Sequence, residues 1–120
     1  MQKKYDNSNI FYKIINKQLP ATIFYEDKDI LAFNDINPKA PVHILIIPKG
    51  EFISFDDFVE KSTNEKVASF FKTVQKIAKD NGLSDNSYRI VGNCGEEAGQ
   101  IVPHFHIHLM GYNLQTKKSE

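Results

Sequence analysis

Three of the four histidines of the chain occupy alternate positions of one apolar run, and no other feature constrains the fold as strongly. The run is GQIVPHFHIHLMG, residues 99–111, and its histidines are His104, His106 and His108. Successive side chains of a β-strand point to opposite faces of the sheet. A strand over residues 101–111 therefore places the three imidazoles on one face and the apolar residues between them on the other. This pattern predicts a sheet with helices packed on its apolar face.

The rest of the chain is typical of short strands and two amphipathic helices. A helix is predicted between Ser8, as its N-cap, and Pro20, which stops it. The clearest helix covers residues 64–82, with apolar residues at helical spacing and a left-handed cap at Gly82. Residues 51–63 are expected to form a loop with at most one short helical turn. The predicted strands cover residues 22–26, 30–36, 42–48, 87–93 and 101–111.

The order of these elements predicts an α+β fold. Consecutive strands are joined by short connections, which favour antiparallel pairing, so we expect one antiparallel sheet with helices mainly on one face. The chain has 120 residues, 41% of them hydrophobic. This size and composition suit a single domain over residues 1–120, with a polar C-terminal tail from about residue 112.

Charge and composition exclude several classes of function. The chain has 15 basic and 15 acidic residues, which argues against binding to nucleic acid or to an anionic membrane surface. Its single cysteine, Cys94, allows no disulfide within the chain and fits a reducing compartment. The N-terminus lacks the apolar run of a signal peptide, and no window approaches the roughly 18 apolar residues of a membrane span. We therefore expect a soluble cytoplasmic protein.

Three aligned imidazoles can act on a phosphate. A neutral imidazole nitrogen is a competent nucleophile, and a neighbouring imidazole can donate a hydrogen bond to an anion or protonate a leaving group. Histidines at positions i and i+2 of a strand can instead bind zinc, with His43 or a carboxylate as the third ligand. A chance cluster of surface histidines is the third alternative, although four histidines placed at random would rarely alternate in this way.

Other residues can support such a site. His43 lies in an apolar strand, where it is either a structural group or a residue that orients the three histidines. The loop before the histidines contains Asn93, Gly99 and Gln100, which can present amide donors to an anion. Asp35, just after the residues LAFN, either belongs to a turn or accepts hydrogen bonds from the hydroxyls of a sugar. Apolar residues near the N-terminus are expected in the core or in the wall of a base-binding pocket.

Three longer segments occur in a recognisable order: IFYKIINKQLP, ILAFNDINPKAPVHILIIPK and NCGEEAGQIVPHFHIHLMG. Within the last of them, HFHIHLM matches the signature His-x-His-x-His followed by two apolar residues, the signature of the histidine triad (HIT) superfamily. In order and spacing, all three segments resemble the corresponding segments of the Hint branch of that superfamily. This branch is the one that resembles purine nucleoside phosphoramidases. The resemblance covers nearly the whole chain.

This resemblance implies a protomer of five antiparallel strands and two main helices, in a homodimer whose sheets join into one of ten strands. It implies a hydrolase without metal or cofactor that cleaves purine nucleoside phosphoramidates, such as adenylated amines, at the α-phosphate of an AMP- or GMP-type nucleotide. His106 would be the nucleophile that forms a covalent nucleotidyl-histidine. His104 and His108 would flank the phosphate, with His108 beside the leaving group, and His43 would orient them.

The resemblance also implies where the nucleotide is held. The phosphate would contact Asn93, Gly99 and Gln100, and the ribose would contact Asp35. The base would lie among the apolar residues Ile10, Phe11, Ile14, Leu19, Phe33 and Ile36.

Three positions depart from the family pattern. Ile101 replaces a serine that many Hint-like sequences carry and that can donate to the phosphate or the leaving group, so the rate or the leaving-group preference is expected to differ. Pro103 cannot donate a strand hydrogen bond, which predicts that pairing starts at about His104 or that this strand lies at an edge. Tyr12 occupies the position of a zinc-binding cysteine of some bacterial relatives, and the chain has no cysteine pair, so no zinc is predicted.

Two other functions stay open on the sequence. The segment PKAPVHILIIPK favours the Hint branch over the dinucleoside polyphosphate hydrolases of the same superfamily, but it constrains the substrate only in part. A non-catalytic nucleotide-binding interaction module is the other alternative.

Overall fold

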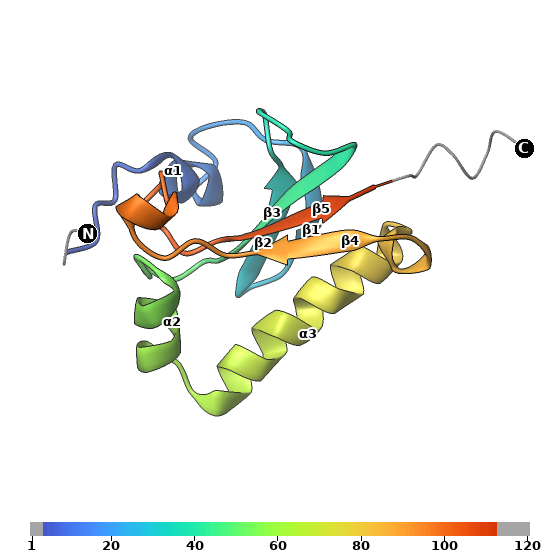
Figure 1. Ribbon diagram of the computed structural model, residues 1–120. Coiled ribbons are helices and arrows are strands. Elements are labelled where there is room, and N and C mark those ends of the chain that lie inside the picture. Colours follow the sequence, from blue (N-terminus) through green and yellow to red (C-terminus); the bar gives the residue numbers. More distant parts are fainter. Residues whose placement is uncertain (1–3, 113–120) are drawn as a thin grey trace, which may run out of the picture.

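Five strands form one antiparallel sheet in the computed structural model of the chain, which describes residues 4–112 (Figure 1). Their spatial order is β1-β2-β3-β5-β4, and every pair of neighbours is antiparallel. The predicted α+β fold with a five-stranded antiparallel sheet is therefore confirmed. The strands are β1 (Ile23–Glu26), β2 (Ile30–Asn34), β3 (Val42–Pro48), β4 (Tyr88–Val91) and β5 (Ile107–Gly111).

The inner strands are the most apolar ones. β3 is a run of aliphatic residues around His43, and six of its seven residues are buried. β1 and β2 are joined by a tight turn, in which Asp27 Oδ1 accepts hydrogen bonds from the backbone N–H groups of Asp29 and Ile30 at 2.7 and 2.8 Å. Such local side-chain acceptors favour turns over regular structure, which is why this turn could be predicted.

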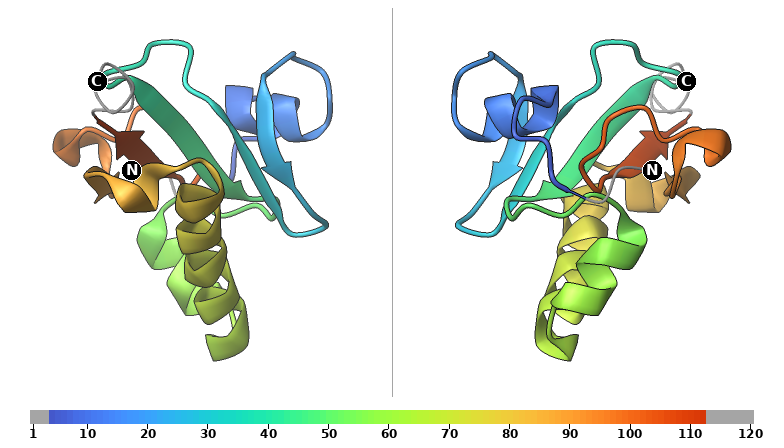
Figure 2. Two further views of the ribbon diagram at one scale, coloured as in Figure 1. Left: turned by 90° about the vertical axis from the view of Figure 1, so that its right-hand side faces the viewer. Right: turned by 90° about the vertical axis from the view of Figure 1, so that its left-hand side faces the viewer.

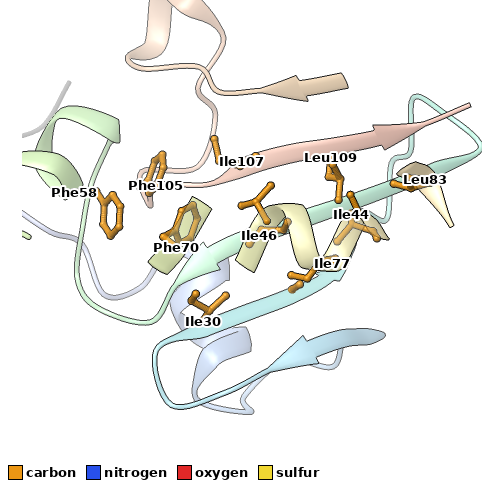
Figure 3. Packing of buried hydrophobic residues seen from close by; sticks show 13 residues of the cluster. Ile30, Ile44, Ile46, Phe58, Phe70, Ile77, Leu83, Phe105, Ile107 and Leu109 are labelled. Atoms are coloured by element: carbon orange, nitrogen blue, oxygen red, sulfur yellow. The ribbon is translucent and has the colours of Figure 1, made fainter. Parts of the chain in front are cut away.

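Two helices, α2 (Phe55–Lys61) and α3 (Asn64–Asp80), cover one face of the sheet (Figure 1). The side chain of Thr63 caps α3 by accepting from the backbone N–H of Lys66 at 3.1 Å. Beyond its end, Gly82 has a φ of 78°, the left-handed conformation predicted there. No helix within residues 4–112 is long and apolar enough to cross a bilayer. Between α3 and the sheet lies the main core (Figure 3), which includes Ile30, Ile44, Ile46, Phe58, Phe70, Ile77, Leu83, Phe105, Ile107 and Leu109.

Helix α2 forms where the sequence analysis expected a loop with one short turn. Its local signals are the N-cap Ser54, which accepts from the backbone N–H of Asp57, and two acidic residues in the first turn. A helix of seven residues is not stable by itself, because nucleation is unfavourable. Phe58 supplies the missing stabilisation, since its ring packs against Phe105 and Phe70 with ring centroids 4.9 and 5.1 Å apart. Those two contacts are tertiary, and the local sequence does not reveal them.

Helix α1 (Ile10–Ile15) lies on the opposite face of the sheet from α3 (Figure 2). Its N-cap is Asn9, whose Oδ1 accepts from the backbone N–H of Tyr12 at 2.9 Å, and not the predicted Ser8. Phe11 anchors the helix by packing against a second core cluster that includes Leu31, Phe33, Leu45 and Ile47. The two helices predicted from the sequence, α1 and α3, therefore lie on opposite faces of the sheet. The expectation of helices mainly on one face holds only for α2 and α3, because the apolar residues of α1 pack on the second core cluster.

The histidine strand starts later than predicted. β5 begins at Ile107, so His104 and His106 precede the strand, and β5 lies between β3 and β4 and not at an edge. The neighbouring strand β4 ends at Val91, which pairs with His108. The residues that precede His108 therefore extend beyond the end of β4. The predicted start of pairing at about His104 is therefore wrong by three residues.

The predicted alternation of faces nevertheless holds through this irregular segment. The backbone N–H of Phe105 donates to the carbonyl of Phe52 at 2.8 Å, a contact that ties the segment to the loop before α2. Phe105, Ile107 and Leu109 lie in the core under α3, and the three histidines lie on the face that carries α1.

Candidate active site

His106 is held by a hydrogen bond at one of its ring nitrogens. Its Nδ1 lies 2.7 Å from the backbone carbonyl of His104. A carbonyl oxygen only accepts, so Nδ1 carries the proton and donates, and Nε2 carries the lone pair. The ring of Phe11 contacts the imidazole edge-on, with ring centroids 5.0 Å apart. Burial lowers the pKa of His106, so the ring is neutral and nucleophilic at neutral pH.

His43 and His108 form a hydrogen-bonded pair whose proton positions follow from the backbone. The N–H of Lys39 donates to His43 Nδ1 at 2.9 Å, so the proton of a neutral His43 lies on Nε2. That Nε2–H points to His108 Nδ1 at 3.0 Å. His108 Nδ1 is therefore the acceptor, and its Nε2 carries a proton that can be donated to a ligand. Burial, together with His106 and His43, lowers the pKa of His108 to about 4. The predicted contact of His43 with the histidine cluster is thus present.

Asp35 lies beside this pair. Its Oδ1 accepts from the backbone N–H of Asn37 at 2.8 Å, and its Oδ2 is 3.3 Å from His43 Nε2. The backbone continues the β2–β3 ladder here, because the N–H of Asp35 donates to the carbonyl of His43 at 2.9 Å. The residue that the family resemblance assigns to the ribose is therefore also a neighbour of the histidines.

His104 has protein partners at both ring nitrogens. Its Nε2 donates to the carbonyl of Pro48 at 2.8 Å, and its Nδ1 lies 2.6 Å from the hydroxyl of Tyr5, which donates to it. The side chain is fully buried, and this burial lowers its pKa to about 4. A contact between His104 and a phosphate would require one of these two hydrogen bonds to break, so its predicted place beside the phosphate stays a prediction.

Sequence reasoning missed Tyr5. Its ring packs edge-on against both His104 and Tyr12, with centroids 5.6 and 5.5 Å apart, and burial raises its pKa to about 12. The hydroxyl is therefore a stable donor over the physiological range. Tyr5 and His104 are 99 residues apart in the chain. No local pattern could have indicated this pair, because only the path of the N-terminal segment brings the two residues together.

Within residues 4–112, one group of side chains has ligand atoms close enough together to suit a metal ion. It consists of Asp35, His43 and His108, whose ligand atoms all lie within 4.8 Å of one another. The hydrogen bonds do not fit this use. His43 Nδ1 already accepts a backbone N–H, so its Nε2 must keep the proton, and a ligating nitrogen must be unprotonated. Metal ligation through Nε2 would need an imidazolate or the loss of the Lys39 contact. The geometry therefore favours a hydrogen-bonded pair over a zinc site.

The predicted phosphate loop is built around Gln100. Its buried Oε1 accepts from the backbone N–H of Gly95 at 2.9 Å, and its Nε2 donates to the carbonyls of Ile53 and Val102 at 2.7 and 3.0 Å. These bonds use the side-chain amide to hold the loop. Gly99, with a φ of 100°, lies against the side chain of Asn93. Glu96 and Glu97 are exposed, as an anion-binding loop would require.

The apolar residues assigned to the base divide into two groups. Phe11 and Phe33 are buried in the cluster beneath α1, with ring centroids 5.4 Å apart. Ile10, Leu19 and Ile36 are exposed, Ile36 to 85%. A shallow hollow of about 400 Å³ beside α1 is lined by Ile14, Leu19 and Ile23, among others. A second hollow, of about 370 Å³, lies on the α3 face and contains none of the predicted site residues.

Comparison with known proteins assigns the chain to a family. The HIT domain family matches residues 16–114 of the chain. The chain belongs to the HIT family. An uncharacterised HIT-like protein of Rickettsia prowazekii (strain Madrid E) is 50% identical to it over 107 residues, 89% of each protein.

Two further relatives of this HIT protein have named activities. Purine nucleoside phosphoramidase of Escherichia coli (strain K12) is 38% identical over 102 residues, 85% of each protein. The crystal structure of a HIT family hydrolase from Legionella pneumophila Philadelphia 1 matches with a TM-score of 0.81 at 40% identity, and the match covers 93% of this chain and 99% of that one. These similarities support a hydrolase role on a nucleotide-binding fold.

Proposed function

We propose that the chain hydrolyses purine nucleoside phosphoramidates at the α-phosphate through a covalent nucleotidyl-histidine on His106. The observation that carries this proposal is the hydrogen bond from His106 Nδ1–H to the carbonyl of His104, which leaves the Nε2 lone pair as the reactive end of the ring. The 38% identity with a purine nucleoside phosphoramidase supports the substrate class.

The reaction proceeds in two displacements at phosphorus. In the first, His106 Nε2 forms a bond to phosphorus, and the P–N bond breaks with its electron pair remaining on the amine nitrogen. That nitrogen takes a proton from Nε2 of a protonated His108, and the amine leaves. In the second, water attacks phosphorus, gives a proton back to His108, and releases His106 and the nucleoside monophosphate. The negative charge of the bound phosphate raises the proton affinity of His108 for this step.

The other site residues take supporting roles in this proposal. Asn93 and the backbone of Gly99 contact the phosphate, while Gln100 holds their loop in place. The side chains of Ile14, Leu19 and neighbouring apolar residues enclose the purine. His104, with both nitrogens bonded, supports the carbonyl that orients His106.

A turnover panel tests the substrate class. We expect an adenosine phosphoramidate to be hydrolysed faster than a dinucleoside polyphosphate or a nucleotide sugar, and a chelator to leave the rate unchanged. Faster turnover of the dinucleoside polyphosphate would assign the chain to the other branch of the superfamily. Loss of activity on chelation, restored by a divalent ion, would contradict the metal-independent mechanism. Absence of turnover on all three substrates would leave a nucleotide-binding module.

We also propose a homodimer in which the β4 strands of two copies pair and extend the sheet to ten strands. At the outer edge of β1 the register with β2 shifts between Ile23 and Tyr25, an irregularity that discourages pairing with another chain. β4 has a regular register with β5, and its Ile90 is 53% exposed. The β4 edge is therefore the better template for a second copy.

Sedimentation tests this assembly. Wild-type protein is expected at twice the protomer mass of 13.8 kDa. Ile90→Lys, which places a charge on the β4 edge, is expected to give monomers, whereas Ile23→Lys on the β1 edge is expected to leave the dimer intact. A monomeric wild type, or dissociation by Ile23→Lys alone, would contradict the assignment of the interface to β4.

A further inference from the structure

The His43–His108 pair presents a problem for the chemistry proposed above. In the resting arrangement His43 donates its Nε2–H to His108 Nδ1. A second proton on His108 must be placed on this same Nδ1, because Nε2 already carries one. Two N–H groups would then face each other across 3.0 Å, which is repulsive. His108 can become protonated only if another acceptor takes the His43 Nε2–H.

Asp35 is placed to be that acceptor. Its Oδ2 is 3.3 Å from His43 Nε2, so a small rotation of the His43 ring moves the N–H from His108 to the carboxylate. Asp35 cannot easily move away. Its other oxygen accepts from the backbone N–H of Asn37, and its own N–H bonds to the carbonyl of His43. The side chain is only 16% exposed, so water screens the interaction weakly.

The charges around His108 also indicate that Asp35 favours its protonated form. His106 precedes it on the chain, His43 faces it from β3, and Lys39 faces it from the loop between β2 and β3; all three oppose a positive charge on His108. Arg89 of β4 is exposed, two residues from the register partner of His108. Among the groups that act on His108 in the described part of the chain, Asp35 alone favours the protonated ring.

We propose that Asp35 is a positioning residue of the reaction: its carboxylate takes over the His43 Nε2–H when His108 becomes protonated and supplies the negative charge that the protonated ring faces. This inference rests on the proposed function for its catalytic consequence, although the proton switch itself is a property of the free protein. It differs from the ribose contact that the family resemblance assigns to Asp35, since its effect reaches the leaving group through His43 and His108.

The variant Asp35→Asn separates the two roles, because it removes the charge and keeps the size and one acceptor oxygen. We compare its kcat and KM on adenosine 5′-phosphoramidate and on the 2′,3′-dideoxy substrate, which has no hydroxyls for Asp35 to bind. The proton switch predicts that kcat falls about 10- to 100-fold on both substrates, since each pKa unit lost by His108 lowers its protonated fraction at neutral pH about tenfold. It also predicts that KM for the dideoxy substrate stays within about twofold. Asp56→Asn, an exposed carboxylate on α2, is the matched control and keeps wild-type kinetics.

A second measurement does not depend on turnover. The 15N chemical shifts of the imidazoles report the protonation midpoint of each histidine in the free protein. The proposal predicts a midpoint for His108 near 4 in wild type and a lower one in Asp35→Asn, because an opposing negative charge has been removed.

Two results would overturn the proposal: a loss of kcat on the ribose substrate that disappears on the dideoxy substrate, or a His108 midpoint that Asp35→Asn leaves unchanged or raises. If the wild type turns over neither phosphoramidate, the proposed function fails, and the His108 midpoint still decides the role of Asp35.

Discussion

His106→Ala is expected to abolish turnover of an adenosine phosphoramidate and to leave nucleotide binding nearly intact. Because Nε2 of His106 is the only nucleophile in the proposed first displacement, we expect kcat to fall by about four to six powers of ten, the range seen when a single residue of a catalytic triad is removed. AMP affinity is expected to change by less than about threefold, since the phosphate loop and the apolar residues beside α1 remain. Steady-state kinetics and titration calorimetry on the same preparation measure both quantities.

A trapped adduct completes the test of His106. Rapid quench in alkaline denaturant during turnover, followed by mass spectrometry at neutral or alkaline pH because acid hydrolyses a P–N bond, is expected to find one nucleotidyl group on the peptide that contains residues 104–108 of the wild type and none on that peptide of His106→Ala. Wild-type turnover rates in His106→Ala would show that His106 is not the nucleophile. An adduct on His104 or His108 in place of His106 would contradict the proton positions deduced from the hydrogen bonds.

Phe105→Ala is expected to destabilise the fold by about 3–5 kcal/mol, the usual cost of removing a buried phenylalanine. Its ring is 2% exposed, stacks on Phe58 with centroids 4.9 Å apart at 18°, and contacts Phe70 at 5.4 Å. The truncation leaves a cavity where α2, α3 and the histidine segment meet. Urea denaturation followed by circular dichroism measures the change in the free energy of unfolding.

The same variant should also impair the site. Phe105 lies between His104 and His106 and holds their irregular segment against the core, so its loss is expected to lower kcat even in buffer where the protein is folded. Phe55→Ala is the control: Phe55 contacts the same ring at 6.0 Å but is 43% exposed, and its truncation is expected to cost less than about 1 kcal/mol. Equal costs for the two variants, or a cost below about 1 kcal/mol for Phe105→Ala, would contradict this description of the core.

The faces of the histidine segment could be predicted although its secondary structure could not. Alternation places His106 and Phe105 on opposite sides in any extended chain, whether or not the chain pairs with a neighbour. Pairing depends on the neighbours, and β4 ends at Val91, so the ladder begins only at Ile107. The same distinction explains α2, whose cap is local but whose stability comes from the contacts of Phe58.

Some residues of the candidate site could be predicted from the sequence, and others could not. The histidines, Asp35 and His43 could be nominated from residue type, order and family resemblance, and the structure brings them together. Tyr5 could not be nominated, and neither could the engagement of both nitrogens of His104. Ile101 remains without an assigned role in the structure, where its side chain is 91% exposed.

The amino-acid sequence by itself determined the buried faces and, apart from α2 and the start of β5, the elements, because the spacing of apolar residues along a helix or strand is a local property of the backbone. Only the tertiary structure decided which nitrogen carries the proton in His104 and in His108. The deciding partners are the carbonyl of Pro48 for His104 and the Nε2–H of His43 for His108, which lie 56 and 65 residues away in the chain. Local sequence cannot specify contacts over such separations, because only the pairing of distant segments in the folded chain brings the two groups together.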